Sequence, residues 1–404
     1  MASAGNQSIA GTVFTIDWLS DLFRKQHSNL SRELADWQAR VTSQGKGYLS
    51  TIVAVSLSWK DSCSELPQQL ILKIPNTAMA AAVFSEKKQE ASVTDLDEWL
   101  VLAHLQECGS YDLLKDAALP IPKIYHSRLI EPSQPGILVM ENMTNGQSAN
   151  FIDGLTTEQL FSVIEGLARI HAYTLKMGVS LLTEKFTAGN EKYRNLWLNI
   201  LGGLVERTKE SVLSFRPEFY HQCLKAVLDK FEPQQLCHLQ YDLHTELDMP
   251  PVLVHGDLWS NNIMFVRDER QKAGPNLLAV FDWQLAHPGT CMEDVAVLLC
   301  ASCSGRLRRQ QSGRAVRHYY STLSGLMEEE VPFSLHQAEE AFERSLPLGM
   351  MFMVLAVPLF SSMADVTQAA DPQLAIDILI ERTQMLVEDV WRDCAGQEAL
   401  DQLN

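Results

Sequence analysis

Three oxygen-bearing side chains in the second half of the chain have the types and spacing of a metal-assisted transfer site. Asp257 follows His255-Gly256, Asn262 comes five residues after it, and Asp282 ends a later apolar run. An Asp can accept the proton of an attacking hydroxyl group, and carboxylate and amide oxygens are ligands that Mg²⁺ prefers. A base beside two oxygen ligands for Mg²⁺ is the arrangement that phosphoryl transfer from a nucleotide requires.

The segments around these side chains predict the hairpin that would bring them together. The apolar run Val252–Val254 predicts a short buried strand before the first Asp. Two further strands are predicted at Ile263–Val266 and Leu277–Phe281, joined by the polar turn Asp268–Asn276. Because a hairpin returns the chain to the level at which it started, the three side chains are expected to lie close together.

The first 143 residues predict a small β-rich lobe. Its patterns predict strands at Tyr48–Trp59, Leu70–Ile74 and Ile137–Met140, an embedded helix from about Thr94, and an earlier helix near Ile16–Arg24. Residues 144–404 predict a mostly helical lobe, whose first helix follows Thr156 and Gln159 at capping-box spacing. The predicted fold class is therefore α+β, with lobes at 1–143 and 144–404.

The composition is that of a globular protein with more than one core, with 404 residues, 46% hydrophobic and 21% charged. Its 50 acidic and 33 basic residues give a formal net charge of -17. This balance argues against nucleic acid or an anionic membrane as the main partner, because both attract a basic surface. The uncharged stretch Ser345–Ala364 contains Pro347 and Pro358, and predicts a buried helix rather than a transmembrane segment.

The eight cysteines are scattered along the chain, and the N-terminal residues lack the pattern of a secretory signal. We therefore expect free thiols and a cytoplasmic location. Cys300 and Cys303 form a single C-x-x-C motif inside an apolar run. A zinc site would need a second such pair, so both are expected to be buried helix cysteines.

Two segments resemble a known superfamily. VLVHGDLWSNNIMF (252–265) and VFDWQLAHPGTCMEDVAVLL (280–299) are similar to the catalytic and metal loops of aminoglycoside- and choline-kinase-like proteins. HGDLWxxN and DWQ resemble most closely the CHK-type, ecdysteroid-kinase-like branch, and the resemblance extends from the turn near Gly45 to the helix after Arg317. It implies a two-lobed protein-kinase-like fold, ATP and Mg²⁺ as cofactors, and a small-molecule hydroxyl group as acceptor.

The resemblance gives roles to the three side chains of the hairpin. Asp257 matches the catalytic base, Asn262 matches a Mg²⁺ ligand, and Asp282 matches the metal-binding Asp of the DWQ motif. His255 is expected to fix the loop through hydrogen bonds rather than to transfer a proton. Trp259 either lines the acceptor pocket or packs beneath the loop.

The resemblance also places nucleotide-binding residues in the first lobe. Lys73, in the apolar segment LILKIP, matches the strand lysine that holds the α- and β-phosphates, the alternative being a solvated strand lysine. Glu98 is its expected helix partner, with Glu90 as the alternative. Gly45 and Gly47 form a G-x-G-x-x-S turn that either covers the phosphates or is an ordinary hairpin turn.

Two features favour a small molecule over a protein as acceptor. Gly256 stands where protein kinases carry the arginine of H-R-D, which reads a phosphorylated activation loop. Eleven residues separate Asp282 from Asp294, too few for a loop that docks a protein substrate. The long segment at about 175–251 is instead predicted to build the acceptor pocket, and no protein partner is expected.

Three functional readings follow from these patterns. The first is an ATP-dependent phosphotransferase acting on a hydroxyl group of a steroid-like, xenobiotic or similar molecule. The second differs only in its acceptor, a choline- or aminoglycoside-type amine. The third is a pseudokinase that binds without catalysis, although such proteins usually lose the base, the metal Asp or the strand Lys, all of which are present here.

Overall fold

The computed structural model describes residues 7–26, 33–42, 50–60, 66–76, 93–186, 193–203, 205, 232–361 and 363–395. The chain divides into two compact units, the first comprising Met1–Gln89 with Pro122–Thr144 and the second Glu90–Ile121 with Asn145–Asn404. The sequence predicted a single division at residue 143. The structure differs from this in one respect, because residues 90–121 belong to the helical unit. The reason is packing, because this segment bonds to residues such as Lys185 and Val280 of the second unit.

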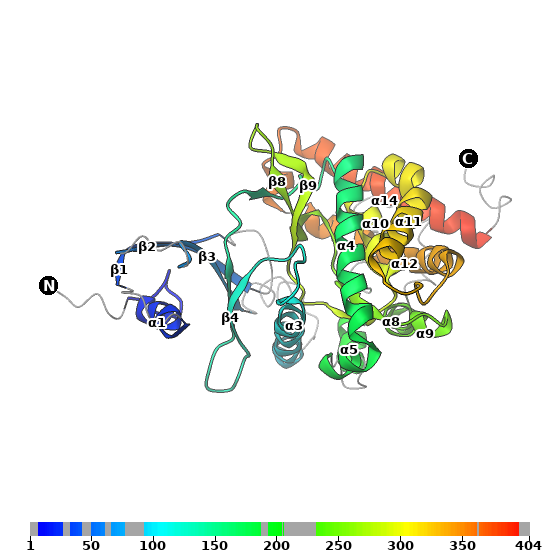
Figure 1. Ribbon diagram of the computed structural model, residues 1–404. Helices are drawn as coiled ribbons and strands as arrows, with labels where there is room; N and C mark the ends of the chain where they lie inside the picture. The colour runs from blue at the N-terminus through cyan, green and yellow to red at the C-terminus, as the bar shows by residue number, and fades with distance from the viewer. Residues whose placement is uncertain are drawn as a thin grey trace. The chain divides into compact units, whose positions relative to one another are not determined.

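The first unit is built on one five-stranded sheet. Its strands are β1 (Leu34–Val41), β2 (Ser50–Trp59), β3 (Gln69–Pro75), β4 (Ile124–Arg128) and β5 (Ile137–Glu141). They lie in the order β1-β2-β3-β5-β4, and every pairing is antiparallel. Figure 1 labels β1, β2, β3 and β4 of this sheet. Lys73 is on β3, where it pairs with Ile52 of β2 and Leu138 of β5. The three predicted strands are confirmed, within one or two residues at their ends.

An amphipathic helix completes the core of the first unit. Helix α1 (Ile16–Gln26) buries Leu19 and Phe23 in the same apolar cluster as Val55 and Leu72 of the sheet. The guanidinium group of Arg128, at the end of β4, lies 5.1 Å from the ring centroid of Phe14 and closes one edge of this cluster. The predicted first helix is confirmed.

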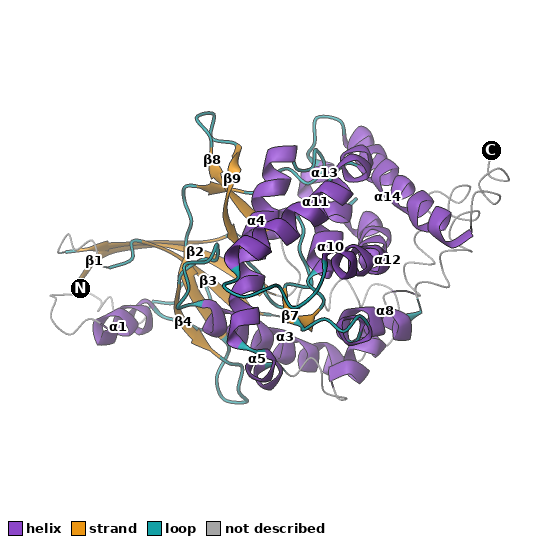
Figure 2. Ribbon diagram, turned by 45° about the vertical axis from the view of Figure 1, so that its right-hand side comes forward, coloured by secondary structure: helices purple, strands orange, loops and turns teal. Residues whose placement is uncertain are grey.

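The second unit is mostly helical. Its helices are α3 (Val93–Leu114), α4 (Thr157–Met177), α5 (Val179–Lys185), α8 (Pro233–Tyr241), α9 (Leu243–Glu246), α10 (Met292–Ser302), α11 (Gly305–Leu326), α12 (Leu335–Phe360), α13 (Ala364–Thr367) and α14 (Pro372–Ala395). Helix α10 is buried along its whole length and packs against α11 and α12 (Figures 1 and 2). Cys300 and Cys303 are buried, as predicted. In the described part of the chain, no helix is both long and apolar enough to cross a bilayer.

Short strands carry the loops of the second unit. They are β6 (Gly146–Gln147), β7 (Val252–Val254), β8 (Ile263–Arg267), β9 (Ala273–Val280) and β10 (His287–Gly289). Strands β8 and β9 form the predicted hairpin, but β9 begins at Ala273, four residues before the predicted start. The turn is shorter than predicted because Asp268 accepts hydrogen bonds from the backbone N–H groups of Arg270 and Lys272, which allows Arg267 to pair with Ala273.

Helix α4 supports this hairpin. Thr156 and Gln159 form the predicted capping box at its start, each side chain accepting from the backbone N–H of the other residue. The amide of Gln159 also donates to the carbonyl groups of Ala273 and Gly274, so the helix terminus is bonded directly to β9 (Figure 2). A sheet-based unit and a mostly helical unit confirm the predicted α+β fold class.

Candidate active site

The loop between β7 and β8 brings Asp257 and Asn262 together. The side-chain amide of Asn262 donates to the backbone carbonyl of Asp257 at 2.8 Å and to its carboxylate Oδ2 at 3.0 Å. A single 3₁₀ turn, Ser260–Asn262, sets this geometry, and the N–H of Asn262 donates to the carbonyl of Trp259. Because Nδ2 is directed to Asp257, Oδ1 is the atom of Asn262 that can bind a cation.

Backbone hydrogen bonds bring the segment before Asp282 to the same place. The N–H of Phe281 donates to the carbonyl of Asn262 at 3.0 Å. The carbonyl of Phe281 accepts from Nε2 of His255 at 2.9 Å. The residue directly before Asp282 is therefore bonded to both ends of the β7–β8 loop, which is the convergence expected from the hairpin.

His255 has a defined tautomer in this arrangement. Its Nδ1 accepts a hydrogen bond from the backbone N–H of Asp257 at 3.2 Å, so the proton is on Nε2, which donates to Phe281. The ring is fully buried against Trp283, with centroids 4.7 Å apart. Both ring nitrogens are engaged by backbone groups, which supports the expected loop-fixing role.

Asp294, in the first turn of α10, holds the other side of the loop. Its carboxylate oxygens accept from the backbone N–H groups of His255 at 2.8 Å and Gly256 at 3.1 Å. Burial acts to raise the pKa of Asp294, but His171, whose Nε2 lies 3.6 Å away, and the backbone N–H of His255 outweigh it. The net pKa is lower than that of an ordinary aspartate, so the loop is held by a buried carboxylate.

Gly256 cannot be replaced by a larger residue without strain. Its φ of +76° lies in the left-handed region, which residues with a side chain rarely adopt. A Cβ atom there would lie 2.5 Å from the carbonyl oxygen of Leu285. The glycine that distinguishes this loop from H-R-D is therefore required by the local backbone.

Asp282 is also in the left-handed region, with φ +69°. Its backbone N–H donates to the hydroxyl oxygen of Tyr111 on α3 at 3.2 Å. Burial, followed by the nearby carboxylates of Glu107 and Asp282, raises the pKa of Tyr111 well above its usual value. Sequence reasoning missed Tyr111, and the signal that could have indicated it is a run of polar residues within α3.

Of the predicted nucleotide-binding residues, the structure describes Lys73 and Glu98. Lys73 is 7% exposed on β3, so it is not a solvated strand lysine. Glu98 lies on α3, half-buried, beside Trp99, which stacks on Trp197 with centroids 6.2 Å apart. Gly45, Gly47 and Glu90 lie outside the described residues.

Trp259 is part of an aromatic cluster. Its ring stacks on Phe360 with centroids 4.9 Å apart and an interplanar angle of 12°, and it also contacts Phe151 and Phe352. The side chain is half-buried. Trp259 therefore packs beneath the loop and still presents part of its ring to the outside.

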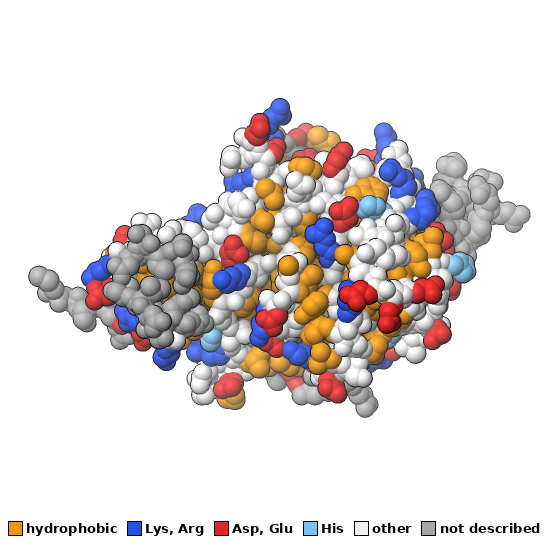
Figure 3. Space-filling view, viewed as in Figure 1, with side chains coloured by type: hydrophobic (Ala, Val, Ile, Leu, Met, Phe, Trp, Pro, Cys, Tyr) orange, Lys and Arg blue, Asp and Glu red, His pale blue; other side chains and the backbone are white. Residues whose placement is uncertain are grey.

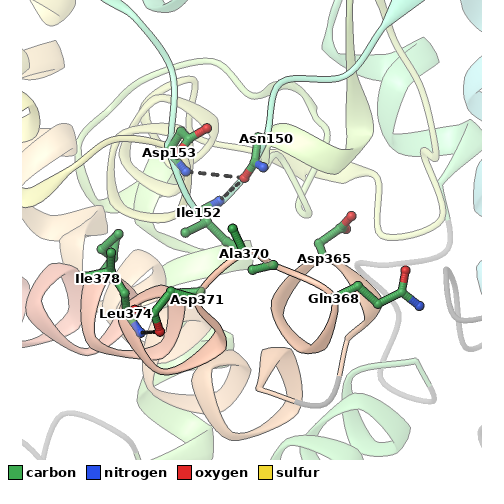
Figure 4. A pocket seen from close by; sticks show the side chains of 11 residues that line it. Asn150, Ile152, Asp153, Asp365, Gln368, Ala370, Asp371, Leu374 and Ile378 are labelled. Carbon is green, nitrogen blue, oxygen red and sulfur yellow. Dashed lines mark hydrogen bonds between the residues drawn. The ribbon is translucent and has the colours of Figure 1, made fainter.

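A pocket of about 490 Å³ is lined by the two residues that flank Phe151 of this cluster and by residues of α13 and α14. The Asn150 side chain accepts from the N–H groups of Ile152 and Asp153 and shapes its rim (Figure 4). Asp153, Asp365 and Asp371 line the pocket together with apolar groups and no basic residue. Its lining residues lie outside the 175–251 segment, for which the acceptor pocket was predicted.

Comparison with known proteins decides the family. The family model DUF1679, described as "Uncharacterized oxidoreductase dhs-27", matches residues 9–393. The chain belongs to this family. The DUF1679 match, together with a kinase-like relative described next, confirms the family relationship that the catalytic and metal loops predicted.

Two relatives come from Caenorhabditis elegans. "Uncharacterized oxidoreductase dhs-27" is 23% identical over 309 residues, 74% of this chain and 37% of that protein. "Uncharacterized kinase-like protein D1044.1" is 24% identical over 230 residues, 56% of this chain and 57% of that protein. The chain thus spans 37% and 57% of these relatives. Among solved structures, choline kinase from Cryptosporidium parvum is 13% identical, with a TM-score of 0.49 over 91% of this chain and 90% of that chain.

Proposed function

We propose that this DUF1679 protein is an ATP- and Mg²⁺-dependent phosphotransferase that acts on a hydroxyl group of a small molecule. The observation that carries the proposal is the bonded set of Asp257, Asn262 and the segment before Asp282. A base next to an amide oxygen, with a second carboxylate just after the adjoining strand, is the set that phosphoryl transfer uses.

In this proposal each side chain has one task. Asp257 orients the acceptor hydroxyl group and accepts its proton. Oδ1 of Asn262 and the carboxylate of Asp282 would hold Mg²⁺, which would offset the negative charge of the nucleotide phosphates. Lys73 holds the α- and β-phosphates, and the buried carboxylate of Asp294 keeps the loop rigid through two backbone hydrogen bonds.

The residues fit Mg²⁺ better than a metal that is held by protein alone. Among the described residues, no group of three or more His, Cys, Asp or Glu side chains is placed to bind a metal. Mg²⁺ usually binds through one or two carboxylates together with substrate phosphates and water. One carboxylate and one amide oxygen, from Asp282 and Asn262, match that pattern.

The name of one relative contains the word oxidoreductase, but the described structure fits oxidoreductase chemistry less well than phosphoryl transfer. The chain matches 37% of that relative's length. Every described strand pair is antiparallel, whereas dinucleotide-dependent oxidoreductases of the Rossmann type bind their cofactor on a parallel, doubly wound sheet. Phosphoryl transfer is therefore the better-supported chemistry.

A screen for acceptor-dependent ATP consumption tests the proposal. The acceptors are hydroxylated steroids, glucosides, phenols and amino alcohols, each with Mg²⁺ present and absent. We expect a signal that requires both an acceptor and Mg²⁺, is lost in Asp257→Asn, and is kept in Asp116→Asn, which alters an exposed Asp far along the sequence from the loop. Mg²⁺·ATP binding without turnover for any acceptor would support the pseudokinase alternative, and turnover in Asp257→Asn would exclude the proposed base.

A further inference from the structure

Helix α3 buries an unusual number of polar side chains in its second half. The polar residues at most 4% exposed are His104, Gln106, Glu107, Ser110 and Tyr111. Charged side chains such as Glu are almost never fully buried unless they have a partner. Glu107 and Tyr111 are four residues apart on one continuous helix, so they share a face.

This face touches the predicted metal loop. The hydroxyl oxygen of Tyr111 accepts the hydrogen bond of the Asp282 backbone N–H at 3.2 Å, at the residue whose φ is +69°. A left-handed backbone is uncommon for an aspartate and persists when the surroundings fix it. The contact therefore acts on the one residue of the loop whose backbone conformation needs support.

Glu107 is buried on the same side of α3. It is 2% exposed, and the four-residue spacing places it one helical turn before Tyr111. Burial first, and then the negative charge of Glu107, raise the pKa of Tyr111. A carboxylate on this face attracts the hydroxyl proton, which leaves an oxygen lone pair of Tyr111 to accept from Asp282.

Helix geometry separates Glu107 from Glu98. An α-helix rises about 1.5 Å per residue, so Glu98, thirteen residues before Tyr111, lies about 20 Å away along the axis. Glu107, four residues before Tyr111, lies about 6 Å away. Of these two carboxylates of α3, only Glu107 is placed to act on the metal loop.

We propose that Glu107 and Tyr111 form a buried pair on α3 that holds Asp282 in its metal-binding conformation. Both are positioning residues. Tyr111 bonds to the backbone of Asp282, and Glu107 acts through Tyr111. The inference rests on the proposed function, since it assigns residues to the same ATP and Mg²⁺ site.

The first test removes one oxygen atom. Tyr111→Phe is expected to raise the Mg²⁺ concentration needed for half-maximal ATP binding at least fivefold. Tyr173→Phe is the matched control, because it also removes a hydroxyl group that contacts α3, one that donates to the carbonyl of Leu113 at 3.5 Å. A Tyr111→Phe protein with the Mg²⁺ dependence of the wild type would show that the hydroxyl does not position Asp282.

The second test compares two matched substitutions on one helix. The same Mg²⁺ dependence is measured by calorimetry for Glu107→Gln and Glu98→Gln. We expect Glu107→Gln to raise the half-maximal Mg²⁺ concentration at least threefold, and Glu98→Gln to change it less than Glu107→Gln does. Equal effects, or a larger effect of Glu98→Gln, would overturn the assignment. A wild type that does not bind Mg²⁺·ATP would contradict the proposed function itself.

A double-mutant cycle tests whether Glu107 acts through the tyrosine. In a Tyr111→Phe background, Glu107→Gln is expected to change the Mg²⁺ dependence by less than about 1.5-fold, because the hydroxyl group that it orients is already gone and the two residues are coupled. A full threefold effect in that background would overturn the pairing. Since Glu107→Gln changes a buried group, Glu107→Asp is measured as well, and it should lie closer to the wild type because it keeps the charge.

Discussion

At the scale of single residues, the candidate site depends on hydrogen bonds that each fix one atom. The amide of Asn262 can donate to Asp257 and bind a cation with its oxygen only in one orientation. His255 accepts from one end of the loop and donates to the segment before Asp282. These hydrogen bonds hold the side-chain oxygens of Asp257 and Asn262 in defined positions. Defined positions of the reacting groups are a condition for rapid phosphoryl transfer.

Asp257→Asn should separate binding from turnover. It removes the proposed base but keeps the shape of the side chain, so turnover should fall by about 10²–10⁴-fold while the Mg²⁺·ATP dissociation constant changes little. Asp282→Asn, by contrast, should weaken nucleotide binding itself in the presence of Mg²⁺. Steady-state rates and calorimetry on both variants check the pair, and reversed effects would exchange the two assigned roles.

Gly256→Ala should lower the free energy of unfolding by at least about 2 kcal/mol, since it combines a left-handed φ with a Cβ atom 2.5 Å from a backbone oxygen. The matched variant is Gly325→Ala, near the end of α11, where a Cβ meets nothing within 4 Å. There, higher helix propensity should stabilise the protein by about 0.5–1 kcal/mol. Denaturant titration of both proteins measures the contrast, and similar values would mean that the loop relaxes around the added methyl group.

At the scale of elements, helix α10 is the support of the loop. Its eleven residues are all buried, and its first turn presents Asp294 to the backbone of His255 and Gly256. Helix α4 adds His171, which lies 3.6 Å from the same carboxylate and 2.7 Å from the hydroxyl of Tyr319 on α11. Three helices therefore meet at one buried charge, so helical packing supports the loop in addition to the hydrogen bonds within the loop itself.

Asp294→Asn should destabilise the fold by about 1–3 kcal/mol at neutral pH, because it removes a charged hydrogen-bond acceptor. The pKa of Asp294 is lowered in the folded state, so its contribution is present above the unfolded value of about 3.9 and is lost as the pH falls through the folded pKa. The stability difference between wild type and variant should therefore shrink in acid. Denaturant titrations from about pH 7 to about pH 3 test this, and a pH-independent difference would contradict the role of the charge.

At the scale of the whole molecule, the charge balance is acidic, so the proposed anionic nucleotide would need a cation to offset electrostatic repulsion. The net charge is -17, and on the face in Figure 3 the described Lys and Arg side chains are interspersed with acidic ones rather than joined in a basic stripe. An ATP molecule approaching such a protein needs Mg²⁺ and local lysine to offset repulsion.

Removal of Mg²⁺ should therefore remove stabilisation by nucleotide. With Mg²⁺, ATP at about 100 times its dissociation constant should raise the free energy of unfolding by about 2.7 kcal/mol. The same ATP concentration with a chelator should have a much smaller effect. Thermal unfolding with and without the chelator measures this, with chelator alone as the control for metal effects on the apo protein. An equal shift in both conditions would rule out the metal-dependent site.

The part of the fold that the sequence predicted best is the part with clear apolar periodicity. Strands β2, β3 and β5 lie in the middle of the sheet and read as apolar runs, whereas β1 and β4 were missed. Those two are the edge strands, and β1 keeps none of its eight residues buried, so no alternation marks it. An edge strand has a neighbouring strand on only one side, so fewer of its residues are buried. Its sequence therefore shows a weaker pattern of apolar residues.

The sequence by itself predicted that Asn262 and the segment before Asp282 meet, because these residues flank a single hairpin that returns the chain to where it started. It also determined the start of α4, where Thr156 and Gln159 are three residues apart. Only the tertiary structure decided that Tyr111 meets Asp282, 171 residues further along the chain. Spacing fixes contacts within a turn or hairpin, whereas contacts between distant segments depend on how helices pack, and no short motif records that.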